Sequence, residues 1–98
     1  DMVTVTSAAR WMAYHALSLI DQDKPSSLHA SMAKAFATEA AVEVTSKALQ
    51  IHGAYGIAEE YKIERYYRDA RCYTIPDGTT QIQKLIIGRE IFGIKAFN

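Results

Sequence analysis

The chain has 98 residues, of which 49% are hydrophobic, so it can form one small domain at most and has enough apolar side chains for a core. Eleven acidic residues balance eleven basic ones, and this neutrality argues against nucleic acid or an anionic membrane as a partner. Apolar runs are far too short for membrane insertion, and the single cysteine, Cys72, excludes an internal disulfide.

Apolar residues recur at helical spacing in four segments, and no segment has a convincing strand pattern. The expected helices cover residues 2–20, 27–51, 62–72 and 80–95 of a single domain, 1–98. The second segment is rich in alanine, which predicts close contact with neighbours on more than one side. The fold class is therefore all-α, an incomplete up-and-down four-helix bundle that exposes apolar surface unless other segments or copies cover it. Because the chain starts at Asp1 in the middle of an apolar pattern, we expect it to be a piece of a longer protein.

Residues 75–83, with the sequence I-P-D-G-T-T-Q-I-Q, place the carboxylate of Asp77 on a turn that opens into the last helix. Gly78 permits a tight backbone, and Thr79 or Thr80 can cap the helix. A side chain in this position projects from the turn and is not buried against the side of a helix, which suits a catalytic base. An ordinary Pro-Asp-Gly turn has the same pattern.

Two helix ends could contribute to a cofactor site. The loop at residues 50–56 offers backbone amides and the side chain of Gln50 beside a helix C-terminus. Residues 79–81 offer hydroxyl and N–H groups at a helix N-terminus, which suits a phosphate or another anion. Helix ends usually cap themselves, so neither segment alone predicts a cofactor.

Other reactive residue types have simpler interpretations. The histidines His15, His29 and His52 are not at metal-ligand spacing, and Cys72 has no nearby histidine and is predicted to be a small core residue. The charges between residues 64 and 71 are spaced for pairing between successive helical turns.

Three motifs together resemble the C-terminal helical domain of the acyl-CoA dehydrogenase family. They are Q-I-H-G-A-Y-G at residues 50–56, E-R-Y-Y-R-D-A-R at 64–71 and I-P-D-G-T-T-Q-I-Q-K at 75–84. They agree with the family pattern in order and spacing, and the resemblance covers essentially the whole chain. It implies the last three-quarters or so of a four-helix bundle, in flavoenzymes that are usually homotetramers and also carry an N-terminal helical domain and a β-domain.

The resemblance implies a FAD-dependent acyl-CoA dehydrogenase that oxidises an acyl-CoA thioester to the 2,3-enoyl-CoA. Asp77 takes the place of the base that removes the α-proton, while hydride leaves the β-carbon for the flavin. Gly78 matches a backbone position near the thioester. The implied partners are the acyl-CoA substrate, an acceptor like electron-transfer flavoprotein, and further copies in a dimer or tetramer. The implied location is the cytoplasm, or the mitochondrial matrix in a eukaryote.

The resemblance also assigns two sets of FAD-binding residues. Gln50, Gly53 and Ala54 match a loop that reaches the FAD of a neighbouring subunit, and Ala54 replaces a second glycine of that loop. Thr79 and Gln81 match residues that contact FAD in their own subunit.

Two departures from the family pattern leave the chemistry open. Pro76 stands where tyrosine is common, and Asp77 stands where glutamate is the rule, so the carboxylate oxygens lie ~1.5 Å further back. Asp77 could be the base of a subfamily similar to dehydrogenases of cyclic acyl-CoA substrates, or the chemistry could be like that of nitroalkane oxidase. The base could also lie elsewhere, or activity could be lost. Another alternative is a helical oligomerisation module without catalysis, and we expect the isolated chain to be inactive.

Overall fold

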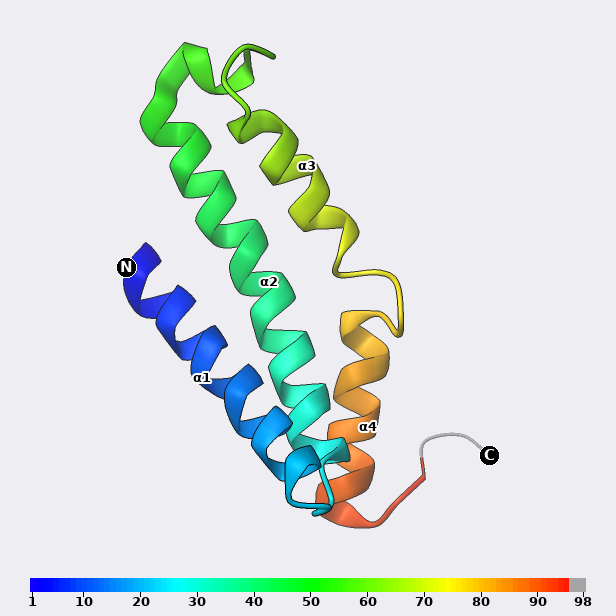
Figure 1. The fold of residues 1–98 in the computed structure, drawn as a ribbon. Helices are drawn as coiled ribbons and strands as arrows, with labels where there is room; N and C mark the ends of the chain where they lie inside the picture. Colours follow the sequence, from blue (N-terminus) through cyan, green and yellow to red (C-terminus); the bar gives the residue numbers. More distant parts are fainter. Residues whose placement is uncertain (96–98) are drawn as a thin grey trace.

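The computed structural model describes residues 1–95, and this part of the chain contains helices and no strand. The elements in chain order are α1 (Met2–Asp21), α2 (Ser27–His52), the short 3-10 helix η1 (Gly53–Ile57), α3 (Ile63–Cys72) and α4 (Thr80–Phe92) (Figure 1). The predicted all-α fold class is confirmed. Residues 96–98 of the expected domain lie outside the described range.

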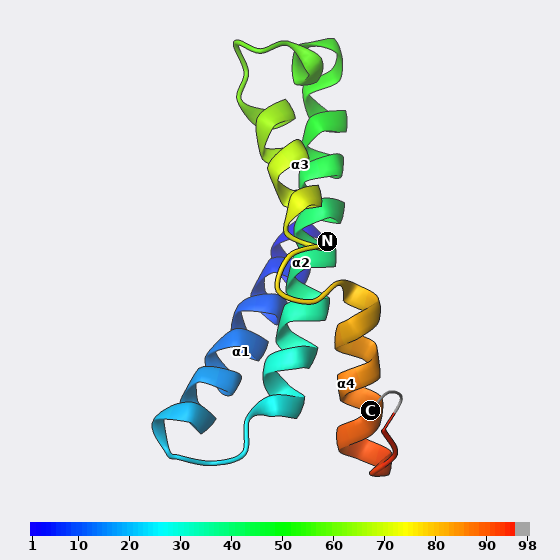
Figure 2. The same cartoon turned by 90° about the vertical axis from the view of Figure 1, so that its right-hand side faces the viewer.

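Helix α2 is the central element, because it packs against every other helix. α1 and α4 lie on opposite sides of its N-terminal half, and α3 lies beside its C-terminal half (Figures 1 and 2). Within residues 1–95, no Cα atom of α1 comes within 8 Å of one in α3 or α4. The buried side chains of Ala33 and Ala40 let neighbouring helices approach α2 closely, as its composition predicts.

The core of the chain is thin. Within residues 1–95, the buried apolar residues are all alanines: Ala16, Ala33, Ala40 and Ala70. Large apolar side chains are exposed on every helix, for example Trp11 at 70%, Ile51 at 72% and Phe92 at 73%. The chain therefore exposes the apolar surface expected of an incomplete bundle.

The two buried residues of helix α4 are polar, and several of its apolar side chains are exposed. Thr80 and Gln83 are its buried residues, whereas Ile82, Leu85 and Ile91 are exposed. The helix ends at Phe92, short of the expected residue 95, because Gly93 takes up a left-handed conformation with φ of 68° and closes the last turn by donating to the Arg89 carbonyl.

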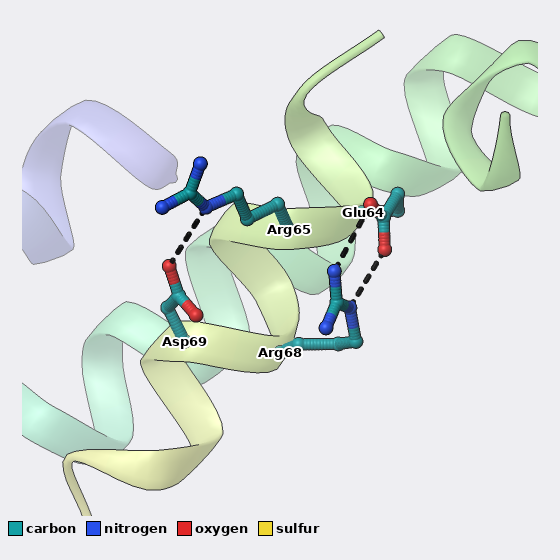
Figure 3. A network of polar contacts seen from close by, with 4 residues as sticks. All are labelled: Glu64, Arg65, Arg68 and Asp69. Atoms are coloured by element: carbon teal, nitrogen blue, oxygen red, sulfur yellow. Dashed lines mark hydrogen bonds and ion pairs between the residues drawn. The ribbon is translucent and has the colours of Figure 1, made fainter. Parts of the chain in front are cut away.

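Charged side chains of α3 pair between successive turns, as their spacing predicts (Figure 3). Arg68 Nε lies 2.8 Å from Glu64 Oε2, and Arg65 Nε lies 3.6 Å from Asp69 Oδ2. The hydrogen bonds from Arg68 hold the pKa of the Glu64 carboxyl below its ordinary value of 4.5. None of the helices in residues 1–95 combines the length and the apolar character needed to cross a bilayer.

Candidate active site

The turn between α3 and α4 gives Asp77 an unusual backbone conformation. Its φ is 56°, and the φ of the next residue, Gly78, is 90°, so two consecutive residues are left-handed. Few residues other than glycine adopt such angles, although aspartate does so more readily than most. The side chain of Asp77 is exposed, and the turn lies beside α2, part of the way along its length (Figure 1).

The backbone of this turn is held from two helices. From α2, Lys34 Nζ donates a 2.7 Å hydrogen bond to the carbonyl of Gly78. From α4, the side-chain amide of Gln83 donates to the carbonyl of Asp77 at 3.1 Å. Two consecutive peptide groups, which carry the carbonyls of Asp77 and Gly78, are thus held in place, and the exposed carboxylate projects from this restrained backbone.

The first turn of α4 uses its two threonines differently. Thr79 is the cap, and its Oγ1 accepts a hydrogen bond from the N–H of Ile82 at 3.3 Å. Thr80 is buried instead, and its Oγ1 donates to Glu39 on α2. Gln81 is exposed. The Thr79 hydroxyl proton and the Gln81 amide therefore remain the groups of this turn suited to donate to an anion.

The second predicted set of residues lies at the far end of α2. Gln50, Gly53 and Ala54 are all exposed, and Gly53 ends the helix with φ of 61°. Gly56, in the same loop, is a site of close packing that the sequence pattern did not reveal. A Cβ atom on Gly56 would lie 2.5 Å from the carbonyl oxygen of Leu49, so the loop folds tightly back onto α2.

One chain does not bring the two sets together. Gly78 contacts Lys34, and Gln50 lies sixteen residues further along the same helix, which is ~24 Å at 1.5 Å per residue. Figure 1 shows the η1 loop at one end of the molecule and the turn before α4 well below it.

A groove of about 940 Å³ runs along α2 between α1 and α4. Of the predicted site residues it includes only Gln81, and its polar residues include Glu39, Thr80 and Lys84. Its apolar lining comes mainly from Val5, Met12, Met32, Phe36, Val42 and Ile87. The groove does not contain Asp77, so it is not a chamber around the candidate base.

Residues 1–92 match the family model of the acyl-CoA dehydrogenase C-terminal domain. The chain belongs to the acyl-CoA dehydrogenase family. The family resemblance drawn from the three sequence motifs is thereby confirmed, and the order of elements in this structure is that of an acyl-CoA dehydrogenase C-terminal domain.

Similar proteins include both reductases and dehydrogenases. Subunit CarC of the caffeyl-CoA reductase-Etf complex of Acetobacterium woodii is 49% identical over 87 residues, covering 89% of this chain and 23% of the relative. A cyclohexane-1-carbonyl-CoA dehydrogenase of Geobacter metallireducens is 45% identical over 91 residues, covering 93% and 24%. The structure of butyryl-CoA dehydrogenase from Megasphaera elsdenii superposes with a TM-score of 0.91 at 37% identity, covering 93% and 24%. The chain thus spans about a quarter of the length of these acyl-CoA dehydrogenase relatives.

Outside the three family motifs, the structure corrects the predicted burial of Cys72 and shows a contact between His15 and His29 that the sequence did not predict. Cys72 is exposed, so its prediction as a core residue is wrong; α3 buries Ala70, and a residue two positions later points ~200° away. His15 and His29, far apart in sequence, have rings 4.6 Å apart at 87° because the α1–α2 hairpin brings them together. Residues 1–95 contain no cluster of three or more histidine, cysteine or acidic side chains that could hold a metal ion.

Proposed function

We propose that this chain is the C-terminal part of a FAD-dependent enzyme that oxidises an acyl-CoA thioester to the 2,3-enoyl-CoA, with Asp77 as the base. The observation that carries the proposal is the exposed Asp77 carboxylate on a turn whose backbone Lys34 and Gln83 hold in place. In an acyl-CoA dehydrogenase motif, this is the position of the base. Because the isolated chain is only about a quarter of its relatives' length, we expect activity only in the longer protein.

A positioned base is what this reaction demands. The α-proton of a thioester is only weakly acidic, so its removal depends on an accurately aligned carboxylate and on the simultaneous departure of hydride. FAD, when bound, accepts that hydride from the β-carbon. Asp77 removes the α-proton, and the neighbouring backbone at Gly78 lies where the thioester group would approach.

The residues present fit a flavin cofactor in two places. At the start of α4, the Thr79 hydroxyl and the exposed Gln81 amide can donate hydrogen bonds to FAD oxygens. At the end of α2, the exposed amide of Gln50 and the backbone of Gly53 and Ala54 offer a second contact region. Since one chain holds the two regions ~24 Å apart, we infer that the second region serves the FAD of another copy in a homo-oligomer.

The short base favours substrates that carry a ring or a branch at the α-carbon. Aspartate reaches less far than glutamate, so the α-carbon of the substrate must lie closer to the turn. Because Asp77 lacks one methylene group, there is room beside its carboxylate for a ring or branch at that α-carbon. A relative that is 45% identical is named cyclohexane-1-carbonyl-CoA dehydrogenase, and the α-carbon of that thioester is a ring atom. This similarity supports the interpretation of Asp77 as the base of a subfamily that acts on cyclic acyl-CoA substrates.

The similarity to the caffeyl-CoA reductase subunit favours a second candidate, the reverse reaction. The same proton transfer runs in both directions by microscopic reversibility, with Asp77 delivering a proton to the α-carbon of an enoyl-CoA. Whether the acyl-CoA is oxidised or the enoyl-CoA is reduced then depends on the protein that exchanges electrons with the flavin. That relative is a subunit of a complex with Etf, and we propose an electron-transferring flavoprotein as the partner here too.

The test uses the full-length protein and compares Asp77→Asn with the control Asp69→Asn, which alters an exposed carboxylate on α3. Flavin bleaching is followed with straight, branched and cyclic acyl-CoAs, and flavin reoxidation with the matching enoyl-CoAs. We expect Asp77→Asn to lower both rates to a small residual level and Asp69→Asn to leave them intact. Normal turnover by Asp77→Asn would refute the base assignment, and turnover of a nitroalkane in place of any acyl-CoA would favour the oxidase alternative.

A further inference from the structure

Two side chains outside the turn hold consecutive backbone carbonyls at the candidate base. Lys34, half-buried on α2, donates to the Gly78 carbonyl at 2.7 Å, and a charged donor makes this a strong hydrogen bond. Gln83 on α4 is only 7% exposed, and its amide donates to the Asp77 carbonyl at 3.1 Å and to the Gly78 carbonyl at 3.4 Å. The two donors approach the same turn from different helices.

The conformation of the turn explains why such support is needed. Asp77 and Gly78 have φ angles of 56° and 90°, and a left-handed aspartate persists only where its surroundings hold it. The Asp77 carbonyl lies in the peptide plane that joins the two residues. A change in the φ of Asp77 would move its carbonyl away from Gln83 and turn its Cα–Cβ bond by the same rotation. The direction of the carboxylate therefore depends on both donors.

We propose that Lys34 and Gln83 are positioning residues for the α-proton transfer, acting through the backbone of Asp77 and Gly78 rather than by touching the substrate. This inference rests on the proposed function, because it takes Asp77 as the base. Lys34 is the more informative of the two residues. It lies 44 positions from Gly78 in sequence and is outside the three motifs that identify the family.

The variants are made in the full-length flavoprotein. Lys34→Met keeps an unbranched side chain as far as the ε position but removes the donor, Lys34→Arg keeps a charged donor, and Gln83→Met removes the amide. The control is Lys47→Met, because Lys47 pairs only with the exposed Glu43 one turn earlier in α2. With an acyl-CoA that the wild-type enzyme oxidises, we expect kcat to fall ~10–100-fold in Lys34→Met and Gln83→Met with little change in KM. Lys34→Arg should recover most of the rate, and Lys47→Met should equal wild type.

A double-mutant cycle separates positioning from a general structural role. Adding Lys34→Met to Asp77→Asn should lower the residual rate no further, because Lys34 acts through the side chain already removed. A second full loss in the double variant, or a rise in KM with unchanged kcat in Lys34→Met, would overturn the proposal. Flavin content and melting temperature show whether each variant is folded. Should Lys34→Met fail to fold, Lys34→Leu, which also lacks a donor, is measured in its place with the same expectation.

The proposed function and the positioning role fail in different ways. An active Asp77→Asn refutes the base and both proposals with it. An inactive Asp77→Asn together with wild-type rates in Lys34→Met and Gln83→Met refutes the positioning role alone.

Discussion

Thr80 on α4 donates a hydrogen bond of 2.6 Å from its Oγ1 to Oε1 of Glu39 on α2. The two residues are 41 positions apart in sequence, and Thr80 is only 7% exposed. The bond fixes the first turn of α4 against the centre of the molecule. It thus joins the helix that follows the candidate base to the helix that carries Lys34.

Replacing Thr80 with valine should destabilise the chain by about 1.5–3 kcal/mol, because a hydrogen bond to a charged acceptor is lost while the shape of the side chain is kept. Urea unfolding followed by circular dichroism measures the change. The matched control is Thr45→Val, since Thr45 Oγ1 donates within its own helix, to the carbonyls of Ala41 and Val42. An equal loss of unfolding free energy in the two variants would show that the hydrogen bond between α4 and α2 stabilises the chain no more than one within a helix.

Two glycines of the same region should respond to alanine in opposite directions. A Cβ on Gly78 would lie 2.7 Å from Gln83 Nε2, and the φ of 90° is unfavourable for alanine, so Gly78→Ala should cost about 1–3 kcal/mol. Gly88 lies inside α4 with nothing within 4 Å of the added atom, so Gly88→Ala should stabilise by about 0.5–1 kcal/mol. Thermal unfolding of both variants measures the difference. A Gly78→Ala variant as stable as the unsubstituted chain would contradict the geometry of the Gly78 turn, and a loss of stability in Gly88→Ala would contradict the open space at Gly88.

The pKa of Glu64 should depend on Arg68. Hydrogen bonding by Arg68 lowers the pKa of this carboxyl below 4.5, and the charge of Arg65 makes a smaller contribution. The pair therefore stabilises the folded chain above pH 4.5 and loses that effect as the pH falls through the lowered pKa. In an NMR titration of side-chain carboxyls, Arg68→Gln should return the Glu64 pKa towards 4.5, and Arg65→Gln should move it less. An equal shift in both variants would show that the hydrogen bonds are not the main cause.

The isolated chain should be colourless and should self-associate. Its only buried apolar side chains within residues 1–95 are alanines, and large apolar residues remain exposed on each helix. Association covers such surface, and each square ångström of apolar area buried contributes about 25 cal/mol. Sedimentation with and without FAD measures the oligomeric state and any bound flavin. A yellow chain that oxidises an acyl-CoA by itself, or one that remains monomeric at every concentration, would contradict this expectation.

The sequence predicts the helical fold and the family well, because both depend on local patterns. Apolar spacing identifies the helices, and the three motifs keep their order and spacing along the chain. What it does not predict depends on how the helices are packed. The contact between His15 and His29 requires the α1–α2 hairpin, and the exposure of Cys72 depends on which side of α3 faces α2.

The same limit applies to the candidate site. The motif at residues 75–84 identifies Asp77, but it contains no sign that Lys34 supports the turn, because that contact forms only when α4 packs beside α2. The separation of Gln50 from Thr79 likewise follows from the direction in which α3 and α4 run along α2. Ile82, Leu85 and Ile91 look like part of a core stripe but are exposed, whereas the polar residues Thr80 and Gln83 of the same helix are buried.

The arrangement in which α1, α3 and α4 each pack on α2, but not on one another, has a consequence for local opening. Helix α1 can detach while α3 and α4 stay packed on α2, whereas opening α2 removes the partner of all three. Amide protons of α2 should therefore exchange with solvent last. Loosening of α1 should leave the protection of α3 and α4, and with it the turn that carries Asp77, intact.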